Sequence, residues 1–104
     1  MTLTALSRAG VPIRLTDERW AHNAEEHCEL AGMREDVVET ISAAERVTAG
    51  DSGELLASRP SSGGKTLVVV YREVSAEDEF VITAFMTRRL AGLERRKQVW
   101  PKPS

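Results

Sequence analysis

The chain has 104 residues, a formal net charge of −2 and a single cysteine. This length predicts one domain around one core, and the lone Cys28 excludes both an intrachain disulfide and a cysteine-based zinc site. The slightly acidic total excludes a protein that clamps nucleic acid through positive charge spread over its whole surface. No apolar run approaches the roughly 20 residues that span a bilayer, so we expect a soluble, cytoplasmic protein with no membrane partner.

The N-terminal residues predict an arm that leads into a helix. Residues 1–11 show no clear period and are expected to form a flexible arm, and residues 12–15 look like an extended entry into the helix. Thr16 can serve as the N-cap, followed by two acidic residues at the positive end of the helix dipole. We expect a single domain over residues 12–99.

Two helices are expected between residues 17 and 42. The first runs to about Leu30, with an apolar stripe that places Cys28 in the core and leaves its glutamates toward solvent. Gly32 then interrupts the helical pattern. Apolar residues at intervals of four mark a second helix that ends near Ser42.

The second half of the chain has the pattern of strands. Short strands are expected at residues 46–49 and 54–58, with a Gly-Asp-Ser-Gly turn between them. Residues 65–74 and 79–89 are rich in β-branched and aromatic side chains. The four residues that separate them, 75–78, are too few for a helix, so this pair predicts an antiparallel hairpin.

The predicted fold is therefore α+β, with two N-terminal helices packed on a four-stranded antiparallel meander. Residues 90–99 can continue as a short basic helix. Residues 100–104 are expected to be an irregular tail, because prolines cannot extend a helix.

Positive charge gathers toward the C-terminus. Residues 1–50 carry a net charge of −4 and residues 51–104 one of +2. Such a concentration can attract anions, and the alternative is a solvated cationic helix end without a ligand. The local excess of +4 comes from five cations against Glu94, namely Arg88, Arg89, Arg95, Arg96 and Lys97.

The first helix carries two histidines with different expected surroundings. At about 100° per residue, His27 lies beside the apolar stripe and His22 faces solvent. Asn23, one turn before His27, can orient it, and proton exchange near neutral pH would suit a catalytic role. A packed or capping histidine is the alternative. The five-residue spacing does not suit two ligands of one metal, and we predict neither a metal site nor a cofactor.

The predicted hairpin contains polar residues that could form a site. Strand alternation puts Tyr71 and Arg72 on opposite faces, and the register decides which of them shares a face with Thr83 and Thr87. Arg72 and Arg88 each offer a planar fork for phosphate oxygens. The equal alternative is a salt bridge to one of the nearby glutamates at positions 54, 73 and 79.

The order of these motifs resembles the phage-associated barnase/EndoU/colicin/RelE-like nuclease families over residues 12–99. The motifs are Ile13-Arg-Leu-Thr-Asp-Glu-Arg-Trp20 with Glu26-His27, Gly53-Glu-Leu-Leu-Ala57, Leu67-Val-Val-Val-Tyr-Arg72 and Phe80-Val-Ile-Thr-Ala-Phe-Met-Thr-Arg-Arg89. The resemblance implies a small metal-independent RNase, often the toxin of a toxin–antitoxin or phage-conflict system. It also implies helices that precede a four-stranded antiparallel sheet.

The resemblance also implies residue roles. His27 matches the histidine of the family's helix, Arg72 matches the basic residue that ends the third strand, and Thr83 or Thr87 with Arg88 match polar positions of the last strand. Two positions depart from the family pattern. Cys28 replaces the usual proline, and Asn23 replaces an apolar residue.

The leading expectation is an endoribonuclease in which the RNA 2′-hydroxyl attacks the adjacent phosphorus and leaves a 2′,3′-cyclic phosphate. Such a reaction needs proton transfer and cations that stabilise phosphoryl charge. We expect His27 to transfer protons, Arg72 and Arg88 to supply the charge, and Tyr71 or Thr83 to supply a hydrogen bond. RNA binding is expected from Arg89, Arg95, Arg96 and Lys97. The alternative is a non-catalytic interaction module, such as an antitoxin or immunity-type partner on the same scaffold.

Overall fold

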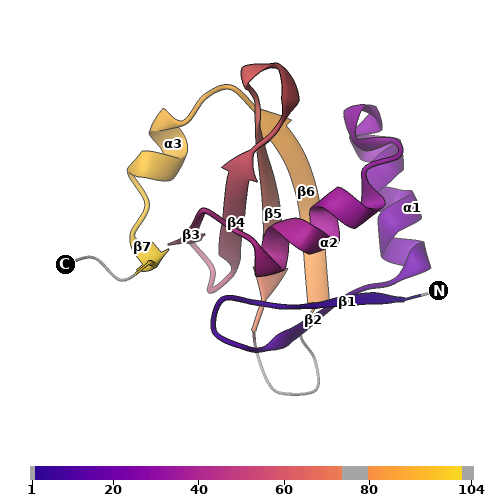
Figure 1. The fold of residues 1–104 in the computed structure, drawn as a ribbon, viewed down its shortest axis with the longest axis horizontal. Coiled ribbons are helices and arrows are strands. Elements are labelled where there is room, and N and C mark those ends of the chain that lie inside the picture. Colours follow the sequence, from indigo (N-terminus) through magenta and orange to yellow (C-terminus); the bar gives the residue numbers. More distant parts are fainter. Residues whose placement is uncertain (1, 74–79, 102–104) are drawn as a thin grey trace.

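The computed structural model describes residues 2–73 and 80–101 (Figure 1). The α-helices are α1 (Asp17–Glu26), α2 (Arg34–Ser42) and α3 (Ala91–Glu94), and the short 3₁₀ turns are η1 (Cys28–Leu30) and η2 (Ser62–Gly64). None of the helices in these residues has the length and apolar content needed to cross a membrane. The strands are β1 (Leu3–Leu6), β2 (Pro12–Leu15), β3 (Arg46–Ala49), β4 (Leu55–Pro60), β5 (Thr66–Arg72), β6 (Phe80–Thr87) and β7 (Gln98–Trp100).

The strands form one mixed sheet of seven in the order β1-β2-β6-β5-β4-β3-β7. Neighbours are antiparallel except β2 and β6, which run parallel where Arg14 lies opposite Phe80. The expected α+β class is confirmed, and β3 to β6 follow one another as a meander. The expectation of a four-stranded, purely antiparallel sheet is wrong in detail, because β1, β2 and β7 extend the sheet at both edges.

The added strands come from segments that the sequence predicted to be irregular or helical. Leu3–Leu6, within the expected arm, pairs with Pro12–Leu15. In place of a helix over residues 90–99, the chain forms the one-turn α3 and then β7, which pairs with β3 and includes Trp100. The expected turn at residues 75–78 and the tail residues 102–104 lie outside the described residues.

Helix α1 begins as predicted but ends early. The hydroxyl oxygen of Thr16 accepts a hydrogen bond from the backbone N–H of Arg19 at 3.2 Å, which confirms the N-cap. His27 leaves the helical region with φ −129° and ψ 74°, and the 3₁₀ turn η1 follows. The expectation that Cys28 lies in the core is wrong, because this change of direction turns it to the surface, where it is exposed.

Helix α2 covers one face of the sheet, and helix α1 lies along its β6 edge. Figure 1 shows α2 crossing that face and α1 standing along the side of β6. Val37 and Ile41 of α2 are fully buried, as the intervals of four predicted. They pack with sheet residues that include Ile13, Leu67, Val69, Val81 and Ala84, so the main core lies between the helices and this face.

The other face of the sheet is covered only in part. Leu93 of α3 packs on Leu56 and Val68 in a second, smaller apolar cluster. We call this second face the open face. No helix other than α3 packs against it in the described part of the chain, and Val70 and Phe85 beside the cluster are only partly buried.

A bulge in β6 decides which polar residues share a face. Val70 lies opposite Thr83, but the next residue, Tyr71, lies opposite Val81, so Ile82 has no partner in β5. An extra residue of this kind resets the alternation of side chains. Tyr71 therefore faces the helices beside Val81, and Arg72 shares the open face with Thr83 and Thr87, as their pairings in the ladder require.

Candidate functional site

The open face has a hollow of about 170 Å³ at the end where β6 stops. Phe85 and Thr87 of β6 and Leu56 of β4 form its floor, and Arg89 and Arg96 stand at its rim. The hydroxyl of Thr87 accepts a hydrogen bond from the backbone N–H of Arg89 at 3.0 Å, which fixes the turn that follows the strand. We call these five residues the hollow of the open face.

A wider, shallower depression of about 460 Å³ continues from this hollow around α3. Arg95 and Lys97 line it, and Arg96 borders both. Arg96 is held by Asp51, whose carboxylate lies 3.2 Å from its Nη1. Four of the five cations predicted to bind RNA or phosphate at this end of the chain are exposed, and Arg96 is half-buried.

Three of the four arginines in this cluster have no competing carboxylate in the described part of the chain. Within residues 2–73 and 80–101, no acidic side chain forms an ion pair with Arg88, Arg89 or Arg95. Their guanidinium groups therefore remain available to an anion, and each can hold phosphate oxygens with two parallel donors. The cluster predicted from sequence is thus a set of available cations beside an aromatic ring.

Arg72 lies at the opposite end of the open face. It pairs with Phe80, whereas Thr66 at the start of β5 pairs with Thr87. Because a strand rises about 3.3 Å per residue, Arg72 is about 20 Å from the Thr87 end. Arg72 and Arg88 therefore cannot hold the same phosphate, which corrects the expectation that both act at one reacting group.

Arg72 is also partnered. Its Nη2 lies 3.8 Å from Oε2 of Glu54, one of the glutamates considered from sequence. The backbone N–H of Ser52 donates to the other oxygen of Glu54 at 3.1 Å. This hydrogen bond first, and the charge of Arg72 to a smaller extent, lower the pKa of Glu54. Glu54 is therefore a fixed carboxylate that neutralises part of the positive charge of Arg72.

Thr83 is tied to helix α1. Its hydroxyl donates to the side-chain oxygen of Asn23 at 3.1 Å, and the backbone N–H of Ala84 donates to the same oxygen at 3.3 Å. Asn23 is buried, with 4% of its surface exposed. Asn23 thus joins α1 to β6. The sequence had suggested a different role, that of orienting His27.

His27 lies at the C-terminal end of α1, and its ring is about one-third exposed. Its Nδ1 lies 3.5 Å from a carboxylate oxygen of Glu29. Figure 1 shows that this end of α1 and the end of β6 lie at the same end of the sheet. His22 is exposed as predicted, with its Nε2 3.1 Å from Glu26.

Tyr71 does not belong to the open face. It is 1% exposed and faces the helices. Burial, and to a smaller extent the charge of Glu73, raise the pKa of its phenol, so Tyr71 remains protonated throughout the physiological range. The structure therefore separates Tyr71 from Thr83, Thr87 and the arginines that the sequence grouped with it.

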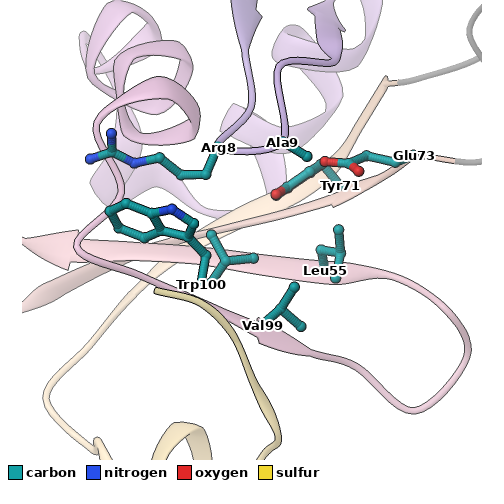
Figure 2. Close-up of a pocket in the computed structure, with 8 residues that line it drawn as sticks. Arg8, Ala9, Leu55, Tyr71, Glu73, Val99 and Trp100 are labelled. Carbon is teal, nitrogen blue, oxygen red and sulfur yellow. The ribbon is translucent and has the colours of Figure 1, made fainter. Parts of the chain in front are cut away.

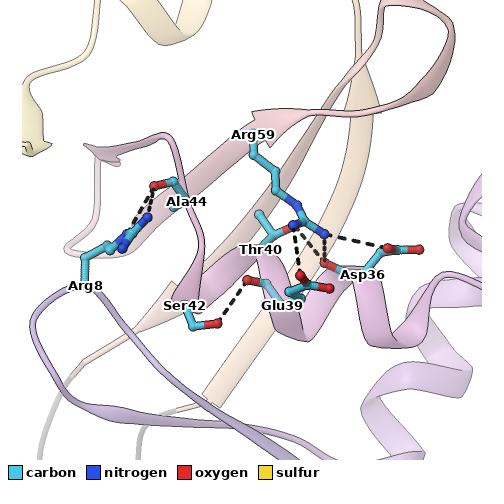
Figure 3. Close-up of polar contacts among 7 residues, drawn as sticks. All are labelled: Arg8, Asp36, Glu39, Thr40, Ser42, Ala44 and Arg59. Carbon is cyan, nitrogen blue, oxygen red and sulfur yellow. Dashed lines mark hydrogen bonds and ion pairs between the residues drawn. The ribbon is translucent and has the colours of Figure 1, made fainter.

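Two further arginines serve the fold (Figure 3). Arg8 donates from Nε and Nη2 to the backbone carbonyl of Ala44, at 3.1 and 2.9 Å. Arg59 donates to the carbonyl of Asp36 at 3.3 Å and lies 3.6 Å from the carboxylates of Asp36 and Glu39. These contacts distinguish Arg8 and Arg59 from the available cations of the open face.

Phe85 lines the hollow but was not among the site residues predicted from the sequence. Its position in a strand-like run gave no sign that it would remain partly exposed beside Arg89. No three His, Cys, Asp or Glu side chains in the described ranges are grouped so that they could hold a metal ion. Comparisons with protein-family models, with curated proteins and with solved structures find no match.

Proposed function

We propose that the chain is a small endoribonuclease, such as a toxin of a toxin–antitoxin or phage-conflict system, that binds single-stranded RNA along its open face. The observation that carries the proposal is the hollow, where the ring of Phe85 lies among arginines and the hydroxyl of Thr87. Proteins bind single strands by stacking bases on aromatic rings and by holding the backbone with cations. The hollow combines both kinds of group within one small site.

The scissile phosphate belongs at the Arg88 and Arg89 end of the face. There the cations have no carboxylate partners among the described residues, so they can stabilise charge that develops on the phosphoryl oxygens. Arg72, at the far end and paired with Glu54, would contact a phosphate several nucleotides away. In this arrangement Arg72 contributes affinity and Arg89 contributes to turnover.

The proposed reaction transfers the phosphoryl group within the RNA. The 2′-oxygen attacks phosphorus, the bond from phosphorus to the 5′-oxygen breaks, and a 2′,3′-cyclic phosphate forms. His27 accepts the proton of the 2′-hydroxyl or returns a proton to the leaving 5′-oxygen. The support for His27 is that α1, which ends just before it, and β6, which ends just before Arg88 and Arg89, finish at the same end of the sheet (Figure 1).

A second candidate is a non-catalytic module that binds a protein partner such as an antitoxin. The observation that favours it is the dispersal of the expected catalytic groups. Tyr71 is buried on the other face, and Arg72 is paired with Glu54. In this function the exposed arginines would bind an acidic protein surface.

One experiment separates the two functions. The purified protein is incubated with a fluorescent single-stranded RNA and, separately, with total RNA, both in excess chelator, and the cleavage ends are mapped. The ribonuclease proposal expects binding, cleavage and cyclic-phosphate ends. Binding without cleavage would reduce the proposal to RNA binding, and the absence of binding would favour the protein-interaction module.

Phe85→Leu tests the hollow directly. The substitution keeps apolar volume against Leu56 and Val68 but removes the ring on which a base can stack. We expect RNA affinity to fall by about 5- to 150-fold, the range that corresponds to about 1–3 kcal/mol for one stacked base. Val70→Leu is the matched control, because Val70 borders the same cluster without an aromatic ring.

A further inference from the structure

The helix-facing side of the sheet contains a second cavity, of about 270 Å³, far from the hollow of the open face (Figure 2). It lies between the loop that joins β1 to β2 and the sheet, with Leu55, Val99 and Trp100 among its walls. The paired residues Leu55 and Tyr71 both belong to the face that carries the main core. This volume is near the lower end of the range for small-molecule sites, about 300–1,000 Å³, and suits a compound with one ring.

Two polar groups reach this mostly apolar cavity, Tyr71 and Glu73. Only 1% of the surface of Tyr71 is exposed. Its hydroxyl makes no hydrogen bond to another described residue. The carboxylate of Glu73 has no ion-pair partner within the described ranges. The Tyr71 hydroxyl is open to the cavity and not sealed from it, so a ligand in the cavity can hydrogen-bond to it.

Arg8 contributes apolar surface to the cavity rather than charge. Its guanidinium lies 4.1 Å from the centre of the Trp100 ring and donates to Ala44, and Figure 2 shows it beyond that ring, away from Tyr71. The aliphatic stem of Arg8 therefore faces the cavity. Among the described residues that line the cavity, Glu73 is therefore the one whose charged group reaches into it.

We propose that this cavity binds a small apolar amine. The ring or chain of the ligand fills the space between Leu55, Val99 and Trp100, and its ammonium group lies at the rim beside Glu73. The negative charge of Glu73 favours a cation over a neutral or anionic group of the same shape. This binding does not depend on the ribonuclease proposal, because the two sites lie on opposite faces of the sheet.

The test compares three probes of similar shape: 2-phenylethylamine, 2-phenylethanol and 3-phenylpropionate. Binding at millimolar concentration is followed by amide chemical shifts of the labelled protein and by fluorescence of Trp100 in a Trp20→Phe background, since the chain has two tryptophans. We expect the amine to shift the signals of Leu55, Tyr71 and Trp100 and to bind about tenfold more tightly than the alcohol. The carboxylate is expected to bind most weakly.

Two variants and a control assign the preference to the cavity. Glu73→Gln should erase the advantage of the amine over the alcohol, whereas Glu94→Gln, which removes an exposed carboxylate on α3, should leave it unchanged. Ala9→Leu, in the exposed part of the loop, should weaken binding of both amine and alcohol by filling the cavity. Failure of the amine to bind, equal affinity for amine and alcohol, or an unchanged preference in a folded Glu73→Gln protein would overturn the proposal.

Discussion

The side-chain oxygen of Asn23 in α1 accepts hydrogen bonds from the Thr83 hydroxyl and from the backbone N–H of Ala84, both in β6. β2 meets β6 at Phe80 and then leaves it for α1. Beyond that point β6 is a sheet edge, whose backbone groups require partners. Asn23 supplies one of these partners and joins the helix to the strand that carries the candidate site.

Replacing Asn23 should therefore destabilise the fold. We expect Asn23→Leu to lower the free energy of unfolding by about 1–3 kcal/mol, because the Ala84 N–H is left buried without its acceptor. Thr83→Val is the matched control. It removes one hydrogen bond but preserves that of Ala84, so we expect a loss of about 1 kcal/mol. Urea unfolding measures both, and equal losses would show that the Ala84 hydrogen bond contributes nothing.

His27 and His22 form a matched pair for testing proton transfer. Both rings are at least one-third exposed, so replacement of either by Gln should leave the thermal midpoint nearly unchanged. We expect His27→Gln to reduce RNA cleavage by roughly 10²-fold or more, the usual contribution of a general acid or base. His22→Gln should retain cleavage. Loss of cleavage in His22→Gln with retention in His27→Gln would identify the other histidine as the catalytic one.

The arginines of the open face should differ in effect according to their position. Arg89→Ala should depress turnover strongly, and Arg89→Lys should restore it poorly because an ammonium group cannot reproduce the two-donor fork. Arg72→Ala, at the far end of the face, should mainly weaken RNA affinity, by an amount that shrinks as salt rises. The measurement is turnover and affinity for each variant at low and high salt.

Arg59→Ala is the control for these arginines. Arg59 bonds to α2, so its loss should lower stability and leave RNA affinity unchanged. Equal, salt-screened losses for Arg89 and Arg72 would reduce both residues to general electrostatic attraction.

The lowered pKa of Glu54 should make the stability of the fold depend on pH. Its pKa is lowered from the ordinary value of 4.5, first by the hydrogen bond from Ser52. A carboxyl whose pKa is depressed in the folded state stabilises the fold above its unfolded pKa, and this contribution disappears as pH falls through the folded pKa. Glu54→Gln should therefore lower stability at neutral pH and flatten its decline below pH 4.5, as measured by urea unfolding at several pH values.

Gly50→Ala tests the same carboxylate without changing it. A β-carbon at Gly50 would overlap the side-chain carboxylate of Glu54, whereas one at Gly92 would meet nothing nearby. The Glu54 side chain can move aside, but it then loses the hydrogen bond from Ser52. Gly50→Ala should thus reproduce the flattened acid profile of Glu54→Gln, and Gly92→Ala should not. An unchanged profile in Gly50→Ala would show that the displaced carboxylate finds equivalent partners.

The central part of the fold could be predicted because its signals are local. Strands β3 to β6 follow one another in the chain and pair with their neighbours, so composition and turn residues were sufficient to order them. β1 and β2 were missed because β2 joins the sheet through β6, far along the chain. β7 was missed because its three residues follow a run of cations that also suits a helix.

The candidate site was predictable in its residue types but not in its geometry. Charge counting found the cations at the end of β6 and around α3. The bulge at Ile82 could not be read from side-chain alternation, and it separates Tyr71 from Thr83. Asn23 was assigned to His27 because the two residues are one helical turn apart, but its partners lie in β6.

The parallel pairing of β2 with β6 also constrains how the chain is made. A ribosome releases the β1–β2 hairpin long before it releases residues 80–87, and a two-stranded hairpin alone is marginally stable in water. During that interval Ile13 and Leu15, fully buried in the finished protein, have no sheet to join. The N-terminal hairpin therefore reaches its final place only after most of the chain has been synthesised, so a chaperone that shields nascent apolar segments should bind there first.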